Sequence, residues 1–214
     1  MTTTETKKNG KNSKGMEVAG TCQLRRGFNE CANRLDWQDK QRQSGPWPIV
    51  YRILALDTGT TNTGFVYVEF IIGELPRLLN FGIIKNQDML KEIGESKHDA
   101  IVMENFQCMG MAVGISTFNA AIWLGRFIEA SRRSHPHQTV HLMHRSAIKM
   151  EICGSPRAKD PNIRQAIIDM YPIGQGGGKV PQIGINKQRG PLYGVSSHVW
   201  SALAVAISFD KIMN

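Results

Sequence analysis

The sequence predicts an α/β domain in which helices flank a mixed central sheet. Two short apolar runs, within residues 53–57 and 99–104, indicate strands that are buried on both faces, and each run ends on a carboxylate. Residues 65–70 have the alternation of a strand that returns beside the first one as a hairpin. Segments with apolar residues at helical spacing follow, and such interleaving of strands and helices is typical of layered α/β domains.

The first strand ends at Asp57, within the segment Asp57-Thr-Gly-Thr-Thr-Asn-Thr-Gly64. Gly59 and Gly64 bracket a turn rich in Thr and Asn, which predicts the hairpin connection. A carboxylate at the mouth of a buried strand is costly where water is excluded, unless a cation compensates its charge. Asp57 is therefore either a turn-capping residue or part of a site that binds a cation.

The remaining elements can be assigned from apolar spacing and turn residues. In chain order we expect a strand at 77–84, a short helix or loop at 88–95, the strand at 99–104, a loop at 105–114, a helix at 115–133, a strand at 139–143, helices near 146–151 and at 161–170, a long loop at 171–194 and a helix at 195–213.

Two of these helices carry specific signals. Phe118 and Ile122 belong to the apolar positions that recur at helical spacing along residues 115–133. Asp160 followed by Pro161 is typical of a helix start, with an N-cap and a proline in the first turn.

Composition indicates a polyanionic partner and a separate N-terminal segment. The 214 residues carry 26 Lys and Arg against 18 Asp and Glu, a net charge of +8, which favours nucleic acid. Residues 1–48 are basic, with little to bury over the first 15, and end in the linker signal Ser44-Gly-Pro-Trp-Pro48. We expect a flexible extension that either holds DNA non-specifically or is a solvated tail, followed by a domain at 49–214.

The cysteines indicate no metal site of their own. Cys22, Cys31, Cys108 and Cys153 form neither a CxxC pair nor a zinc-binding spacing with histidine. The sequence has neither a signal peptide nor a bilayer-spanning apolar run. We therefore expect reduced thiols in a cytoplasmic protein that has no membrane partner.

Asp57 and Glu104 both end buried strands, and open α/β sheets place ligand sites at the carboxyl ends of their strands. Two carboxylates at neighbouring strand ends repel each other unless a metal ion neutralises them. Oxygen ligands suit Mg²⁺ or Mn²⁺, and a pair of such ions can promote in-line displacement at a phosphodiester. The candidate for a third ligand is His198, at the start of the last helix.

Four segments resemble, in the correct order, the RuvC-type crossover-junction endonucleases, especially phage members of that family. They are Ile-Leu-Ala-Leu-Asp57-Thr-Gly-Thr-Thr-Asn-Thr-Gly64, Ala-Ile-Val-Met-Glu104-Asn-Phe106, the stretch from Lys149 to Asp160, and His198-Val-Trp-Ser-Ala-Leu-Ala-Val-Ala-Ile207. The resemblance covers residues 49–213. It implies an RNase H-like fold, a homodimer, divalent-metal catalysis and cleavage of branched DNA, usually four-way Holliday junctions.

Carried over by position, Asp57 and Glu104 match the first two acids of the family's metal site. His198 and Ser201 stand where the family usually has its last two carboxylates, and residues 171–208 contain no acid that could replace them. A neutral imidazole can ligate a metal or act as an acid or base, so His198 keeps either role open. Its structural alternative is an ordinary surface position on a helix.

The resemblance also assigns secondary roles. Lys149, in the catalytic centre, and Lys159 resemble the family's paired phosphate-contacting lysines, and Phe106 stands where the family stacks an aromatic ring on an unpaired base. Solvated lysines and a phenylalanine that plugs the core are the structural alternatives. The acid-free, Gly-rich loop at 171–194 adds a phosphate-binding surface: Lys179, Lys187 and Arg189.

The sequence thus predicts a metal-dependent endonuclease that nicks branched DNA with two Mg²⁺ or Mn²⁺ ions per site and no nucleotide cofactor. A catalytically inactive DNA-binding protein of the same fold is one alternative. An actin-like ATPase or sugar-kinase fragment is another, because Asp57-Thr-Gly-Thr-Thr also resembles their phosphate-binding turn. That class needs two α/β domains around its nucleotide, typically each of domain size, and only about one fits in this chain.

Overall fold

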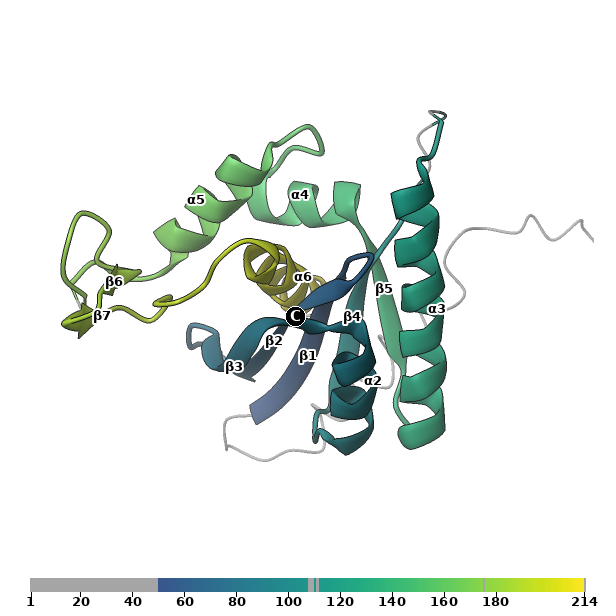
Figure 1. The fold of residues 1–214 in the computed structure, drawn as a ribbon. Coiled ribbons are helices and arrows are strands. Elements are labelled where there is room, and N and C mark those ends of the chain that lie inside the picture. The colour runs from purple at the N-terminus through teal and green to yellow at the C-terminus, as the bar shows by residue number, and fades with distance from the viewer. Residues whose placement is uncertain (1–49, 108–109, 111, 175, 214) are drawn as a thin grey trace, which may run out of the picture.

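A five-stranded mixed sheet forms the centre of the protein (Figure 1). The computed structural model describes residues 50–107, 110, 112–174 and 176–213. The strands of the central sheet are β1 (Val50–Thr58), β2 (Asn62–Ile71), β3 (Arg77–Lys85), β4 (Ala100–Asn105) and β5 (Val140–His144). The helices are α2 (Asn86–Glu95), α3 (Ile115–Ser134), α4 (Arg145–Cys153), α5 (Asp160–Met170) and α6 (His198–Met213).

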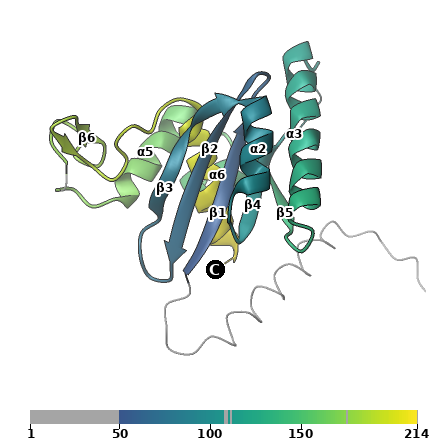
Figure 2. The ribbon, with the colours of Figure 1, turned by 60° about the horizontal axis from the view of Figure 1, so that its bottom comes forward.

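The strand order is β3-β2-β1-β4-β5. β1, β2 and β3 form an antiparallel meander, whereas β4 and β5 run parallel to β1. Helices cover both faces: α2 and α3 lie on one, and α4, α5 and α6 on the other (Figures 1 and 2). This arrangement confirms the predicted α/β class with its mixed central sheet.

β1 is buried on both faces, as its continuous apolar run predicts. Ile53 and Ala55 face the core cluster that contains α6, and Leu54 and Leu56 face the cluster formed with α2 and α3. All four are fully buried. A strand that serves two cores needs apolar residues at successive positions, which explains why this run does not alternate.

α6 crosses β1 and β2 and is buried along most of its length. Its N-terminal end approaches β2 so closely that a Cβ atom built on Gly64 would lie 2.6 Å from Cβ of His198. Only a glycine permits this approach, since non-bonded carbon atoms normally stay about 3.5–4.0 Å apart. Gly64 pairs with Asp57 across the hairpin, so this contact also sets the position of α6 beside Asp57.

Several element boundaries differ from the sequence-based prediction. The last helix begins at His198, because Val195 to Ser197 belong to the preceding loop. That loop contains a small hairpin, β6 (Gly184–Ile185) and β7 (Gln188–Arg189), which the Gly-rich composition concealed. Asp160 is the first residue of α5 and not the cap before it.

The predicted basic extension at 1–48 lies outside the described residues. The same holds for three of the four predicted reduced thiols, those of Cys22, Cys31 and Cys108. Cys153 is described and is a free thiol. Among the helices that are described, none has the length and apolar character needed to cross a membrane.

We expect Gly64→Ala to lower the free energy of unfolding by about 1–3 kcal/mol, because the added methyl group overpacks the contact between β2 and α6. The matched control is Gly125→Ala in α3, where an added Cβ has nothing within 4 Å. This change should raise stability by roughly 0.5–1 kcal/mol through helix propensity. Urea titration of both variants measures the difference; equal stability of Gly64→Ala and the parent protein would contradict the close contact.

Candidate active site

The sheet register sets Asp57 and Glu104 side by side. In the parallel pair of β1 and β4, Leu56 is level with Met103, so the next residue of each strand is an acid at the same edge. The two side chains are only 16% and 13% exposed. The predicted pair of strand-end carboxylates is therefore present as neighbouring, poorly hydrated groups.

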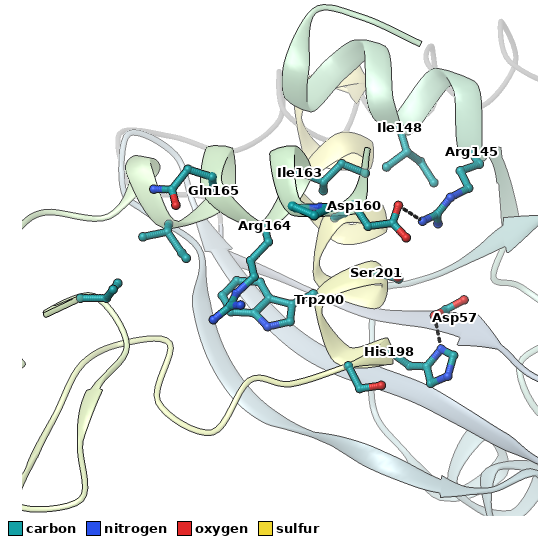
Figure 3. A pocket seen from close by; sticks show the side chains of 15 residues that line it. Asp57, Arg145, Ile148, Asp160, Ile163, Arg164, Gln165, His198, Trp200 and Ser201 are labelled. Carbon is teal, nitrogen blue, oxygen red and sulfur yellow. Dashed lines mark hydrogen bonds and ion pairs between the residues drawn. The ribbon is translucent and has the colours of Figure 1, made fainter. Parts of the chain in front are cut away.

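His198, the first residue of α6, contacts Asp57 directly. Its Nδ1 lies 2.9 Å from Oδ2 of Asp57, and its side chain is 55% exposed (Figure 3). A hydrogen bond between a carboxylate and one ring nitrogen orients the imidazole and selects its tautomer. The acid of β1 and the histidine of α6, distant in the sequence, thus form one unit.

Glu104 is paired with an arginine that the sequence analysis did not select. Nη1 of Arg145 donates hydrogen bonds to both carboxylate oxygens of Glu104, at 2.9 and 3.0 Å. Nη2 of the same guanidinium donates to Oδ1 of Asp160 at 2.5 Å (Figure 3). Burial raises the pKa of Glu104; Arg145 opposes this shift and the nearby Asp57 carboxylate adds to it.

An open cavity of about 790 Å³ lies beside these residues, and Glu104 is the one of them that does not line it. Asp57, His198 and Ser201 contribute to its wall together with Arg145 and Asp160. Further lining comes from α5 and α6, where the guanidinium carbon of Arg164 lies 5.3 Å from the centre of the Trp200 ring. The cavity therefore has carboxylates, cations and an aromatic ring within reach of one ligand.

The donor set of Asp57, Glu104 and His198 fits a hard divalent cation in its chemistry. Two carboxylates with little hydration need a counter-charge, and a neutral imidazole is an acceptable additional ligand. Within the described part of the chain, however, no three His, Cys, Asp or Glu side chains converge as a ready-made metal site. Both oxygens of Glu104 accept hydrogen bonds from Arg145, so the guanidinium is the cation that neighbours this carboxylate in the structure.

The predicted lysines lie near this site but outside the cavity wall. Lys149 is half-buried on α4, and Lys159 is exposed directly before α5; neither is among the described residues that line the cavity. Phe106 is half-buried and packs against the apolar cluster of α2 and α3. Its predicted role in stacking on a base stays a prediction, beside this packing role in the structure.

The loop after α5 carries Lys179, Lys187 and Arg189, all exposed as expected. Arg189 lies over the ring of Tyr193, with its guanidinium carbon 4.7 Å from the ring centre. Such stacking holds the guanidinium in place, and its Nη2 also donates a hydrogen bond to Oδ1 of Asn186 at 3.3 Å.

The sequence pattern did not assign Arg145 to the site, and it indicated Asp160 only as a helix start. Asn105 pairs with His144 in the parallel pair of β4 and β5, so Arg145 leaves the sheet beside the end of β4. The available signal was that Arg145 follows a predicted strand closely. It became informative only once the strand order was known.

No protein-family model and no curated protein sequence matches the chain. Among solved structures, Thermus thermophilus RuvC in complex with a Holliday junction substrate aligns over 74% of this chain and 92% of its own, with 16% identity and a TM-score of 0.53. A second structure of Thermus thermophilus RuvC has 15% identity, 75% and 92% coverage and a TM-score of 0.50.

The yeast mitochondrial Holliday junction resolvase Ydc2 aligns over 76% of this chain and 79% of its own, with 9% identity and a TM-score of 0.51. The protein thus has the RNase H-like α/β fold of RuvC and Ydc2. This result confirms the fold that the four sequence segments imply.

Proposed function

We propose that the protein is a divalent-metal-dependent endonuclease that nicks branched DNA, with four-way junctions as its substrate. The observation that carries this proposal is the pair of poorly hydrated carboxylates, Asp57 and Glu104, at the ends of adjacent parallel strands beside an open cavity. The RuvC-like fold supports it, since one structure with this fold contains a Holliday junction substrate.

In the proposed mechanism, Asp57, Glu104 and His198 are the residues that would hold Mg²⁺ or Mn²⁺, with two ions per site. Bound there, the ions would activate a water molecule and stabilise the charge that develops on the phosphodiester. Asp57 orients the imidazole of His198 through Nδ1, so that Nε2 is the nitrogen available for a ligand or a proton. Ser201, one turn along α6, can orient a water molecule.

The proposed DNA-binding surface begins at the cavity wall, where the lining residues Asp160 and Val180 are chain neighbours of Lys159 and Lys179. Its exposed cations are Lys159, before α5, and Lys179, Lys187 and Arg189 in the following loop. Half-buried Lys149 contributes from α4. Residues 171–208 contain no Asp or Glu, so this loop has no carboxylate that would repel a DNA phosphate.

A four-way junction has symmetry-related strands, so paired nicking requires two active sites, and we propose a homodimer. α3 offers a surface for a second copy. Ile115, Phe118 and Ile122 are 76%, 57% and 62% exposed, on the side of the helix opposite its buried residues. An exposed apolar stripe of this kind suits the two-fold contact of identical chains.

A catalytically inactive junction-binding protein is the second candidate. It is favoured by Ser201, which stands where the resemblance expects a carboxylate, and by the pairing of Glu104 with Arg145. The two candidates differ in whether a bound junction is cut when a divalent metal is added.

Asp57→Asn and Glu104→Gln should each lower the rate of junction nicking by at least about a hundredfold, while junction affinity changes little. Removing a proposed metal ligand removes catalysis, whereas affinity comes mostly from contacts of Lys and Arg with phosphates. Nicking of a labelled synthetic junction and a gel-shift titration measure the two quantities. Glu74→Gln, an exposed acid in the turn between β2 and β3, is the control and should behave as the parent protein.

If Asp57→Asn cuts at the parent rate, the assignment of the metal site is wrong. If the parent protein binds the junction but does not cut it in Mg²⁺ or Mn²⁺, the inactive-binder function replaces the nuclease.

His198 should make Mn²⁺ a better activator than Mg²⁺, since Mn²⁺ accepts nitrogen ligands more readily. His198→Asp should move this preference toward Mg²⁺, and His198→Ala should be nearly inactive. The measurement is the ratio of nicking rates in the two metals for each variant. An alanine variant as active as the parent would make His198 a bystander.

Replacing the exposed Phe118 and Ile122 together by Asp should convert the proposed dimer to a monomer without unfolding it, because both side chains point away from the core. Light scattering coupled to size-exclusion chromatography measures the mass, and circular dichroism checks the fold. A parent protein that is monomeric at micromolar concentration would contradict the dimer.

A further inference from the structure

One guanidinium connects a buried carboxylate to an exposed one. Arg145 binds both oxygens of Glu104 through Nη1 and Asp160 through Nη2. The side chains of Glu104, Arg145 and Asp160 are 13%, 34% and 71% exposed, so the three groups form a chain from the sheet edge to solvent. Arg145, the cation at the centre of this chain, is not one of the cations that the sequence resemblance selected.

The buried end of this chain should be the stronger one. A charge-assisted hydrogen bond gains strength where water is excluded, whereas an exposed ion pair such as that with Asp160 contributes little. Each oxygen of Glu104 accepts one hydrogen bond from Arg145 and retains a second lone pair, but a divalent cation that binds there must approach the positive charge of the guanidinium. Arg145 and the metal ion therefore compete for one carboxylate.

Asp160 gives Arg145 a partner when a metal ion takes its place at Glu104. It begins α5, on the cavity wall, and its carboxylate is accessible from the same cavity as Asp57. A guanidinium that leaves Glu104 can thus keep one of its ion pairs. It need not become unpaired at the moment when the metal ion binds.

We propose that Arg145 is a built-in counter-ion of Glu104, which a divalent metal displaces and Asp160 retains at the cavity wall. This inference rests on the metal site of the proposed function. Arg145 is a positioning residue: it orients the carboxylate of Glu104 through two hydrogen bonds when no metal is bound, and it lowers the affinity of the site for metal. The protein then binds metal more weakly than its carboxylates alone would allow.

The test is a Mn²⁺ titration of the full-length protein without DNA, with free Mn²⁺ measured by electron paramagnetic resonance. Arg145→Gln should bind Mn²⁺ about tenfold more tightly than the parent, because the competing charged hydrogen bonds are gone. The matched control is Arg164→Gln, which removes a cation from the same cavity that lies on Trp200 and not on Glu104. Its affinity should change by less than about threefold, as expected of a screened charge.

Two further variants keep the proposal falsifiable. In Arg145→Gln/Glu104→Gln the gain in affinity should disappear, which locates the competition at Glu104. Arg145→Lys retains the charge but cannot bridge both carboxylates, so its affinity should lie between those of the parent and Arg145→Gln. It also serves as the test if Arg145→Gln fails to fold, as judged by circular dichroism.

The proposal would be overturned if Arg145→Gln and Arg145→Lys bind Mn²⁺ no more tightly than the parent protein. It would also be overturned if the gain in affinity survives in Arg145→Gln/Glu104→Gln, or if Arg164→Gln shows an equal gain. Absence of Mn²⁺ binding in the parent and in all variants would overturn it as well. The outcome is separable from the proposed function: a protein that nicks junctions with no gain in Arg145→Gln refutes only the competition. A protein that shows the gain but does not nick junctions refutes only the nuclease.

Discussion

The parallel pairing of β1 and β4 brings two carboxylates together at one edge of the sheet, and this like-charge contact governs the surrounding structure. Asp57 and Glu104 have little access to water, so each needs a partner. His198 provides one for Asp57 and Arg145 provides one for Glu104. Both partners are the first residues of helices that begin beside these strand ends. The sheet register brings the two acids together, and the helix starts supply the groups that bind them.

The approach of α6 to the sheet is the second constraint. His198 can reach Asp57 because Gly64, the hairpin partner of Asp57, has no side chain to hold the helix away. The rest of α6 is almost wholly buried, and its small alanines allow the helix to lie close over β1 and β2. Packing of the core and geometry of the site are therefore set by the same contact.

Each acid of the site has an internal partner, which distinguishes this arrangement from an open cluster of carboxylates. An internal partner stabilises the folded protein when no other cation is present, but it also occupies oxygens that a ligand would use. Exposure increases from Glu104 through Arg145 to Asp160. In the proposed competition, Arg145 can therefore give up Glu104 to a ligand and keep its ion pair with the exposed Asp160. Proteins commonly accept some loss of stability or affinity at functional sites for such reasons.

Local patterns in the sequence determined much of the fold. The double-sided apolar run before Asp57, the hairpin turn, the strand that ends at Glu104 and the helix that begins at Asp160 all depend on neighbouring residues, so their signals are local. The α/β class and the two strand-end acids followed from them. The resemblance to RuvC-type enzymes, read from four short segments, agrees with the fold that the structure has.

Only the tertiary structure decided which side chains meet at those acids. Arg145 carries no local mark of its role, because its place beside Glu104 depends on the order β1-β4-β5 and on the register of parallel strands. The placement of His198 at the start of α6 likewise depends on a long-range contact, that with Gly64 of β2. The sequence by itself determined the two strand-end acids, Asp57 and Glu104. The strand order and the packing of α6 decided which residues bind them, because partners distant in the chain become neighbours only when the sheet is assembled.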